Sequence, residues 1–196
     1  MRFLAALLLI VPGLAAQAVD LRGVGRAWTE LGAPASERLR LNLDAGAIAI
    51  RPSADGQVRL RYTGRRDQDL SRVRVRFEAQ ASTPELRVSN TPHEDFHLEI
   101  EVPRKVALTL RMSAGDLSLQ GIEGDKDLRL QAGELKLKVE DAAAYGPVSA
   151  SVWAGEVNPG PFGASKGGLF RTFSHQGPGR YAIQVKVKAG EIRFLP

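Results

Sequence analysis

The chain has 196 residues, no cysteine and a formal net charge of +5 at pH 7. Because disulfides are excluded, packing and hydrogen-bonded strands must hold the fold, even outside the cytoplasm. The length suits one domain with a sizeable core, and so mild a basic excess does not by itself indicate a nucleic-acid partner.

The N-terminal residues 1–18 have the composition of a secretory signal peptide. Arg2 supplies a positive start, residues 3–11 are almost entirely apolar, and Ala16–Gln17–Ala18 is a small-residue cleavage pattern. The apolar run is shorter than the roughly 20 residues that span a membrane. We therefore predict cleavage after Ala18, a periplasmic or secreted location, and no transmembrane segment after cleavage.

The remainder of the chain divides into two parts. Residues 19–36 contain glycine and proline with little periodicity, which predicts a linker or an N-terminal cap. Residues 37–196 consist of short alternating segments bounded by turn residues, which predicts a β-strand-repeat domain. The first expected strands are 39–43, 48–50, 58–62, 73–77, 86–88 and 96–102.

A repeated unit dominates residues 108–139, LTLRMSAGDLSLQGIEGDKDLRLQAGELKLKV. In each copy, apolar residues alternate, an Ala-Gly pair and an acid follow, and the alternation resumes in the opposite phase. Side chains alternate between the two faces of a strand, so the shift would turn the core outward unless the chain bends at the Ala-Gly pair. Glycine permits such a bend. The expected corner glycines are Gly46, Gly115, Gly133, Gly155 and Gly190.

The spacing of the corners predicts the architecture. Gly115, Gly133 and Gly155 are separated by 18 and 22 residues, which suggests one rung for about every twenty residues. We predict an all-β, single-domain β-solenoid similar to a parallel β-helix, with looser rungs in the longer gaps on either side. A β-sandwich built from hairpins is the alternative.

The same units resemble a known family. The segments VPRKVALTLRMSAGDL and VKVKAGEIRF, within residues 37–196, are similar to the bacterial "putative adhesin" β-strand-repeat proteins of unknown function. The resemblance implies an exported β-solenoid-like domain. It brings no catalytic residues to this chain.

Five residues are candidate ligand contacts. Arg59, Arg61, Arg74 and Arg76 occupy outward positions of expected strands, where they could meet an anionic envelope polymer or simply discourage aggregation. Trp153 also has outward parity and offers a platform for a sugar or a partner protein. The Pro/Gly loop that follows, with Phe162, offers a cover for the indole, and we favour this covered arrangement.

Acidic residues follow four of the corner glycines: Asp116, Glu134, Glu156 and Glu191. If the corners stack, these carboxylates form a column about 4.8 Å apart that could coordinate a hard cation such as calcium. We favour the alternative, in which basic neighbours neutralise the column. The expected neutralising residues are Arg111, Arg129 and Lys186. We predict no bound metal and no cofactor.

His93, Glu94 and His97 match the HExxH zinc motif. That chemistry requires a helix, which brings both imidazoles onto one face. Pro92 precedes the motif and HLEIEV follows it, which favours a loop and then a strand, with the two histidines about 13 Å apart. A zinc hydrolase is therefore the weaker alternative.

These observations predict a non-enzymatic, exported binding or scaffolding module of the cell envelope, with no catalytic residues. The expected partner is an envelope or extracellular protein or an anionic glycan, and not nucleic acid. The competing function is an enzyme acting on envelope polysaccharide, because clustered carboxylates with Lys and Arg on one sheet can cleave acidic polysaccharides. Fold-level analogy alone does not decide between them.

Overall fold

The computed structural model describes residues 18–22, 25–92, 94–163 and 166–196. The predicted signal peptide lies outside these residues, apart from Ala18. Within the described part, no helix is long and apolar enough to cross a membrane. The only helical elements described are α1 (Asp67–Leu70) and two short 3-10 turns, Ala142–Ala144 and Gly160–Phe162, so the prediction of an all-β protein is confirmed.

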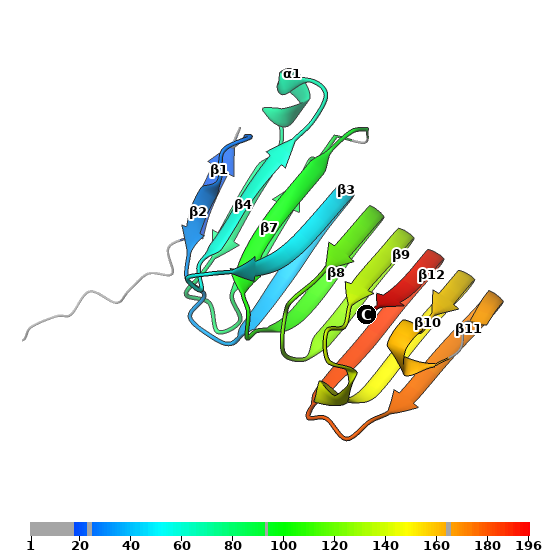
Figure 1. Ribbon diagram of the computed structural model, residues 1–196. Helices are drawn as coiled ribbons and strands as arrows, with labels where there is room; N and C mark the ends of the chain where they lie inside the picture. The colour runs from blue at the N-terminus through cyan, green and yellow to red at the C-terminus, as the bar shows by residue number, and fades with distance from the viewer. Residues whose placement is uncertain (1–17, 23–24, 93, 164–165) are drawn as a thin grey trace, which may run out of the picture.

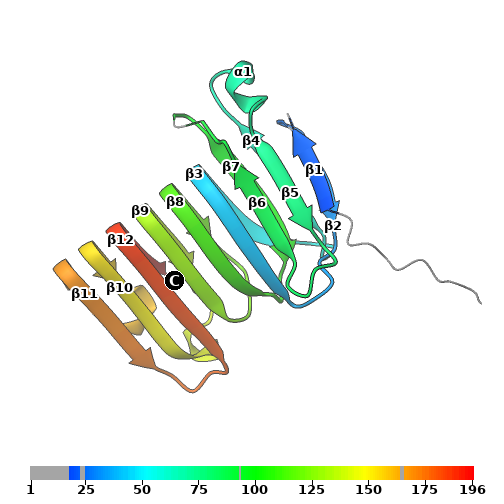
Figure 2. The same ribbon diagram turned by 180° about the vertical axis from the view of Figure 1, so that it is seen from behind.

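Twelve strands form one mixed sheet (Figures 1 and 2). The strands are β1 (Ala18–Arg22), β2 (Thr29–Gly32), β3 (Arg38–Ser53), β4 (Val58–Thr63), β5 (Arg74–Glu78), β6 (Glu85–Ser89), β7 (His97–Pro103), β8 (Ala107–Leu119), β9 (Lys126–Lys138), β10 (Tyr145–Asn158), β11 (Lys166–Gln176) and β12 (Tyr181–Leu195).

Five long strands pair in parallel, in the order β3, β8, β9, β12, β10. Their corner glycines are aligned: Gly46 faces Gly115, Gly115 faces Gly133, and Gly190 lies between Gly133 and Gly155. The last strand of the chain is thus inserted between β9 and β10. The structure does not place an additional parallel rung in the gap before β12, because β11 pairs antiparallel with the far side of β10.

Each long strand bends at its corner, which divides the sheet into two layers. The first half of β3 pairs with β6 and the second half pairs with β7, so the sheet forks there. We call the layer that contains β1, β5, β6 and the first halves of the long strands the first layer (Figure 2). The second layer contains β2, β4, β7 and the second halves (Figure 1). The sheet is not closed, and residues 19–36 contribute β2 and most of β1 at one end.

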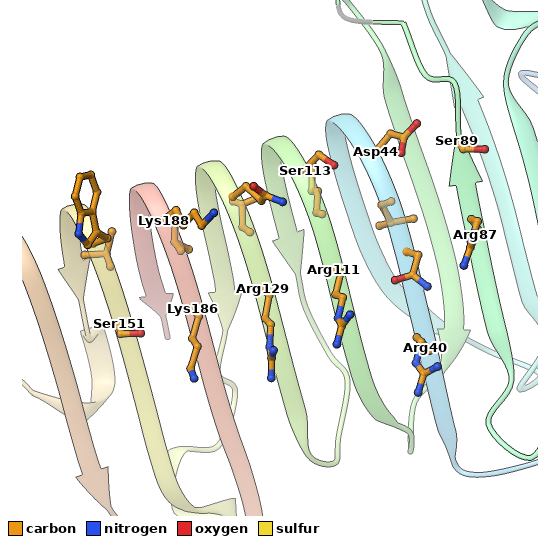
Figure 3. Close-up of a pocket in the computed structure, with 18 of the residues that line it drawn as sticks. Arg40, Asp44, Arg87, Ser89, Arg111, Ser113, Arg129, Ser151, Lys186 and Lys188 are labelled. Carbon is orange, nitrogen blue, oxygen red and sulfur yellow. The ribbon is translucent and has the colours of Figure 1, made fainter.

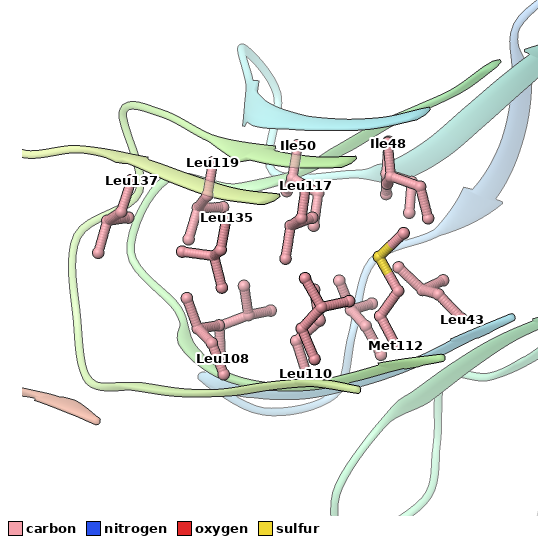
Figure 4. Close-up of a cluster of buried hydrophobic side chains, with 14 of the residues drawn as sticks. Leu43, Ile48, Ile50, Leu108, Leu110, Met112, Leu117, Leu119, Leu135 and Leu137 are labelled. Carbon is pink, nitrogen blue, oxygen red and sulfur yellow. The ribbon is translucent and has the colours of Figure 1, made fainter. Parts of the chain in front are cut away.

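The core lies between the two layers. In β8, Leu108, Leu110 and Met112 project from the first layer toward Leu117 and Leu119 of the second (Figure 4). All five side chains are buried although their parity changes at Gly115. The predicted shift of phase at the Ala-Gly corner is therefore confirmed, and it keeps one apolar face inward.

The corner glycines are required by close backbone contact. Gly133 has φ +126° and Gly190 has φ +136°, a region that other residues rarely adopt. A Cβ added at Gly133 would overlap the carbonyl oxygen of Gly115, and one added at Gly190 would overlap that of Gly133. Each corner therefore rests directly on the backbone of the corner before it.

We predict that Gly133→Ala lowers the free energy of unfolding by about 2–5 kcal/mol, because it combines backbone strain with an overlap that only backbone movement can relieve. Urea denaturation followed by circular dichroism measures the effect. Gly25→Ala is the matched control, since a Cβ there meets nothing within 4 Å. Equal stability of the two variants would contradict the proposed contact.

Candidate functional site: a basic groove

The parallel register places basic side chains in one row across the outer face of the first layer. Direct pairing links Arg76 to Arg87, Arg87 to Asn42, Asn42 to Arg111, Arg111 to Arg129, and Arg129 to Lys186. We call the five cations of this series the basic row: Arg76, Arg87, Arg111, Arg129 and Lys186. Adjacent strands are about 4.8 Å apart, so the row presents positive charge at the spacing of the sheet.

Acidic side chains compensate only part of the basic row. Arg76 pairs with Glu78 at 2.9 Å, Arg87 with Glu85 at 2.9 Å, and Arg129 with Asp127 at 3.2 Å. Arg111 and Lys186 form no ion pair with any residue that the structure describes. The uncompensated positive charge is therefore concentrated on Arg111 of β8 and Lys186 of β12, on either side of the paired Arg129.

Glu85 fixes the compensated end of the row. Burial opposes ionisation of this carboxyl, but hydrogen bonds from Asn42 and Arg87, with the charges of Arg87 and Arg40, outweigh that effect and lower the pKa of Glu85. The carboxylate is thus held charged beside its partners.

The three central cations of the row, Arg111, Arg129 and Lys186, repel one another. Like charges directly opposite each other on neighbouring strands are destabilising. Arg111, Arg129 and Lys186 occupy three successive strands in this way, and Figure 3 shows them side by side. Their side chains are exposed, so packing does not require them.

An open groove of about 1260 Å³ runs over this part of the first layer (Figure 3). Seven of its lining side chains are basic and two, Asp44 and Glu85, are acidic. The carboxylate of Asp44 accepts a hydrogen bond from the backbone N–H of Asn90 at 2.7 Å. Both acids of the groove are thus engaged by the protein, and its remaining charge is positive.

Trp153 lies at one end of the groove, on β10, with 60% of its surface exposed. Our preference for a covered indole is wrong. Phe162 is buried and packs edge-on against Phe194, with the ring centroids 5.5 Å apart, so it turns inward rather than over the indole. Lys188 of β12 occupies the position that corresponds to Trp153, one residue before the corner alanine.

The four predicted arginines divide between the two layers. Arg74 and Arg76 lie on β5 of the first layer, the layer that carries Trp153. Arg59 and Arg61 lie on β4 of the second layer, where Arg59 pairs with Glu101 at 2.7 Å and Arg61 with Glu99 at 2.7 Å. The five candidate contacts therefore do not form a single site.

Arg61 also contributes to a compensated cluster around Trp28. Its guanidinium lies 4.7 Å from the centre of the Trp28 ring, and that of Arg51 lies 5.3 Å from it. Arg51 in turn pairs with Glu101 at 3.0 Å and with Glu99 at 3.2 Å. Stacking and ion pairing together explain these arginines as part of the fold.

The three central cations of the basic row occupy the same position in their repeats. From the sequence we assigned them a different role. Arg111, Arg129 and Lys186 each stand four residues before a corner glycine. We expected them to neutralise the acids after the corner, but the bend places those acids on the second layer. Alignment of the repeats on their glycines is the signal that identifies the row. Ser151 and Asn42 occupy the same position in the two remaining repeats.

The acids do form a column, in the order Asp116, Glu134, Glu191, Glu156. Lys136 pairs with Glu134 at 2.8 Å, and Arg193 pairs with both Glu134 and Glu191. These cations stand two residues after the acids and therefore share their face. The hydrogen bond from Arg193 lowers the pKa of Glu191, with burial opposing and the charges of Arg193 and Lys136 assisting.

The described residues offer no set of ligands for either the calcium site or the zinc site considered above. Among the described residues, no group of three His, Cys, Asp or Glu side chains is arranged to hold a metal ion. Of the zinc motif, His93 lies outside the described residues, Glu94 is in a bend, and His97 begins β7. The prediction of a loop followed by a strand is confirmed for residues 94–97.

Lys126 is a charged residue in an interior position. It aligns with Leu108 and Ile183 on the neighbouring strands and is 3% exposed. Its Nζ donates hydrogen bonds to the Gly124 carbonyl oxygen at 2.9 Å and to Tyr145 Oη at 2.6 Å. Burial lowers the pKa of Lys126 to about 8, although Asp125 and Glu123 act in the opposite direction. The buried ammonium group therefore costs folding stability at neutral pH.

We predict that the free energy of unfolding rises from about pH 8 to about pH 9.5 because of Lys126. The pKa of Lys126 is about 8 in the folded state and 10.5 for an ordinary lysine, so between these values the unfolded chain binds the additional proton. Nearer pH 10 the buried Tyr62 and Tyr145 oppose this rise, because burial raises the pKa of each to about 12 and the unfolded chain loses their protons first. Lys126→Met should be more stable than the wild type at pH 7, by about 1–4 kcal/mol. The difference should shrink as the pH approaches 10.5.

Denaturant titrations of both proteins across this pH range measure the effect. Lys138→Met, a change at an exposed lysine of the same strand, is the control. A Lys126→Met variant that is less stable than the wild type at pH 7 would show that the hydrogen bonds of the ammonium group outweigh its burial.

Comparisons with known proteins identify a fold but no family. No protein-family model matches the chain, and no curated protein matches it. A "putative cell adhesion protein" from Clostridium sporogenes has a similar solved structure, with a TM-score of 0.58 and 14% sequence identity. The alignment covers 91% of this chain and 99% of that one. At this identity the similarity shows a shared fold.

Proposed function

We propose that the protein is a non-enzymatic, exported binding module of the cell envelope, and that the groove in the first layer is its recognition surface. The observation that carries the proposal is the row of exposed like charges on β8, β9 and β12, of which Arg111 and Lys186 have no ion-pair partner among the described residues. Binding accounts for the charges, because a negatively charged partner would offset their mutual repulsion.

The shape and composition of the groove support binding over catalysis. The groove is open, its charge is predominantly basic, and its two acids are both hydrogen bonded to the protein. Two acids of the corner column, Glu134 and Glu191, are held in ion pairs on the second layer. A set of converging carboxylates, which the cleavage of a polysaccharide would use, is thus a poorer fit to the described residues than a surface for recognition.

The clostridial protein of similar fold, whose name refers to cell adhesion, supports an adhesin-like role. We also propose that the parallel ladder is of the solenoid class, with antiparallel strands at each end. Five long strands with aligned corners support this assignment over a sandwich of hairpins. Such a ladder would serve as a rigid support for the groove.

Binding to washed bacterial envelope fragments tests the proposal. We expect the wild type to sediment with the fragments at low ionic strength and to be released by salt, because exposed charges are screened. The groove variant, Arg111→Gln with Lys186→Gln, should bind roughly tenfold less or weaker still.

The control variant is Arg104→Gln with Lys138→Gln, which removes two exposed charges outside the groove. It should bind like the wild type. Failure of the wild type to sediment would refute envelope binding. Equal binding by the groove and control variants would show that the attraction is general and does not depend on the groove.

A further inference from the structure

We infer that the ligand of the groove is a linear acidic glycan of the polyuronate class, lying across the strands with one sugar ring stacked on Trp153. This inference rests on the proposed function and specifies the partner of the same site. It depends on the spacing of the cations, the polar residues between them and the position of the indole.

The spacing of the basic row fits a polymer with one negative charge per sugar. Arg111, Arg129 and Lys186 lie directly opposite one another on successive strands, about 4.8 Å apart. The repeat of an extended pyranose chain is close to the distance between neighbouring strands. A polyuronate that runs perpendicular to the strands therefore places about one sugar over each strand. Successive sugars of such a chain are rotated about its axis, so the carboxylates of alternate sugars face the sheet and meet Arg111 and Lys186, which lie two strands apart. Guanidinium groups suit carboxylates because they offer paired N–H donors.

Neutral polar side chains lie among the cations of the groove. Ser113, Gln131 and Ser151 line it together with the basic residues. Their hydroxyl and amide groups both donate and accept hydrogen bonds, as the hydroxyl groups of a sugar chain require. A surface that only attracted negative charge would not need this combination.

Trp153 adds an apolar contact at one end. Ser151, on the same strand, continues the line of Lys186, and Trp153 is the next outward residue along β10. An exposed indole beside a line of cations provides a flat apolar face for the C–H groups of a sugar ring while the carboxylates reach Lys186 and Lys188. A polyanion that lacks sugar rings would not use this face.

Other polyanions fit less well. Proteins that hold single-stranded nucleic acid stack successive bases on several aromatic side chains, and the described part of the groove has one exposed aromatic. Peripheral attachment to an anionic membrane combines basic residues with a broad apolar face. The outward positions between the cations are instead polar. Nucleic acid and lipid are therefore alternatives for the test to exclude.

The experiment measures binding to polygalacturonate by isothermal titration calorimetry and by tryptophan fluorescence. The methyl-esterified polymer is the matched ligand control, since it keeps the sugar rings and removes the charges. We expect saturable binding to the acidic polymer, and binding weaker by roughly tenfold or more to the ester. Trp153→Ala should lower the affinity by about tenfold and abolish the ligand-induced fluorescence change, because Trp28 lies on the second layer.

Chain length provides a second criterion. The proposed binding line crosses β8, β9, β12 and β10, so the affinity for galacturonate oligomers should rise up to about four residues and then level off. The groove variant should lose binding to the tetramer, and the control variant should keep it. Affinity that rises with total charge alone, without a plateau, would overturn the inference.

The outcomes separate this inference from the proposed function. Groove-dependent binding to envelopes without binding to polygalacturonate would refute the glycan and leave the binding module in place. Tighter groove-dependent binding to phosphatidylglycerol vesicles or to single-stranded DNA would also refute it and would name the better ligand. Binding to polygalacturonate without attachment to envelopes would refute the proposed function alone.

Discussion

The contact between successive corner glycines is the constraint on which the rest of the structure depends. The carbonyl oxygen of one corner lies where a Cβ of the next would be, as between Gly115 and Gly133. Such contact permits one register only, because a shift by one residue would bring a side chain into the corner. The glycine also allows each strand to bend at the corner, so that apolar residues of opposite parity face a single core.

Because the register is fixed, residues at the same position of each repeat lie in one line across the sheet. Residues four before the glycine become the basic row on the first layer, and residues just after the glycine become the acid column on the second. The bend keeps these two lines apart. Glu134 and Glu191 therefore pair with Lys136 and Arg193 and do not neutralise Arg111 or Lys186. The proposed recognition surface is in this sense a product of the corner geometry.

The corners could be predicted from sequence because alternation is a local property, and its change of phase at Ala-Gly is visible within a dozen residues. The order of the strands could not, since the repeats carry nearly the same pattern and β12 pairs as well with β9 as with β10. The basic row depends on that order and was therefore missed. The exposure of Trp153 depends on Phe162 packing against Phe194, a contact between distant segments.

The order β9, β12, β10 is the central structural claim, and cysteine pairs test it most directly, because the chain contains no cysteine of its own. Arg129 and Lys186 lie opposite each other on adjacent strands, whereas β12 separates Arg129 from Ser151. Disulfides need Cα atoms roughly 4.4–6.8 Å apart, which adjacent strands satisfy and next-nearest strands, about 9.6 Å apart, do not. Under mild oxidation followed by mass spectrometry, Arg129→Cys with Lys186→Cys should form a disulfide, and Arg129→Cys with Ser151→Cys should not. The reverse result would place β10 beside β9 and would contradict both the strand order and the basic row.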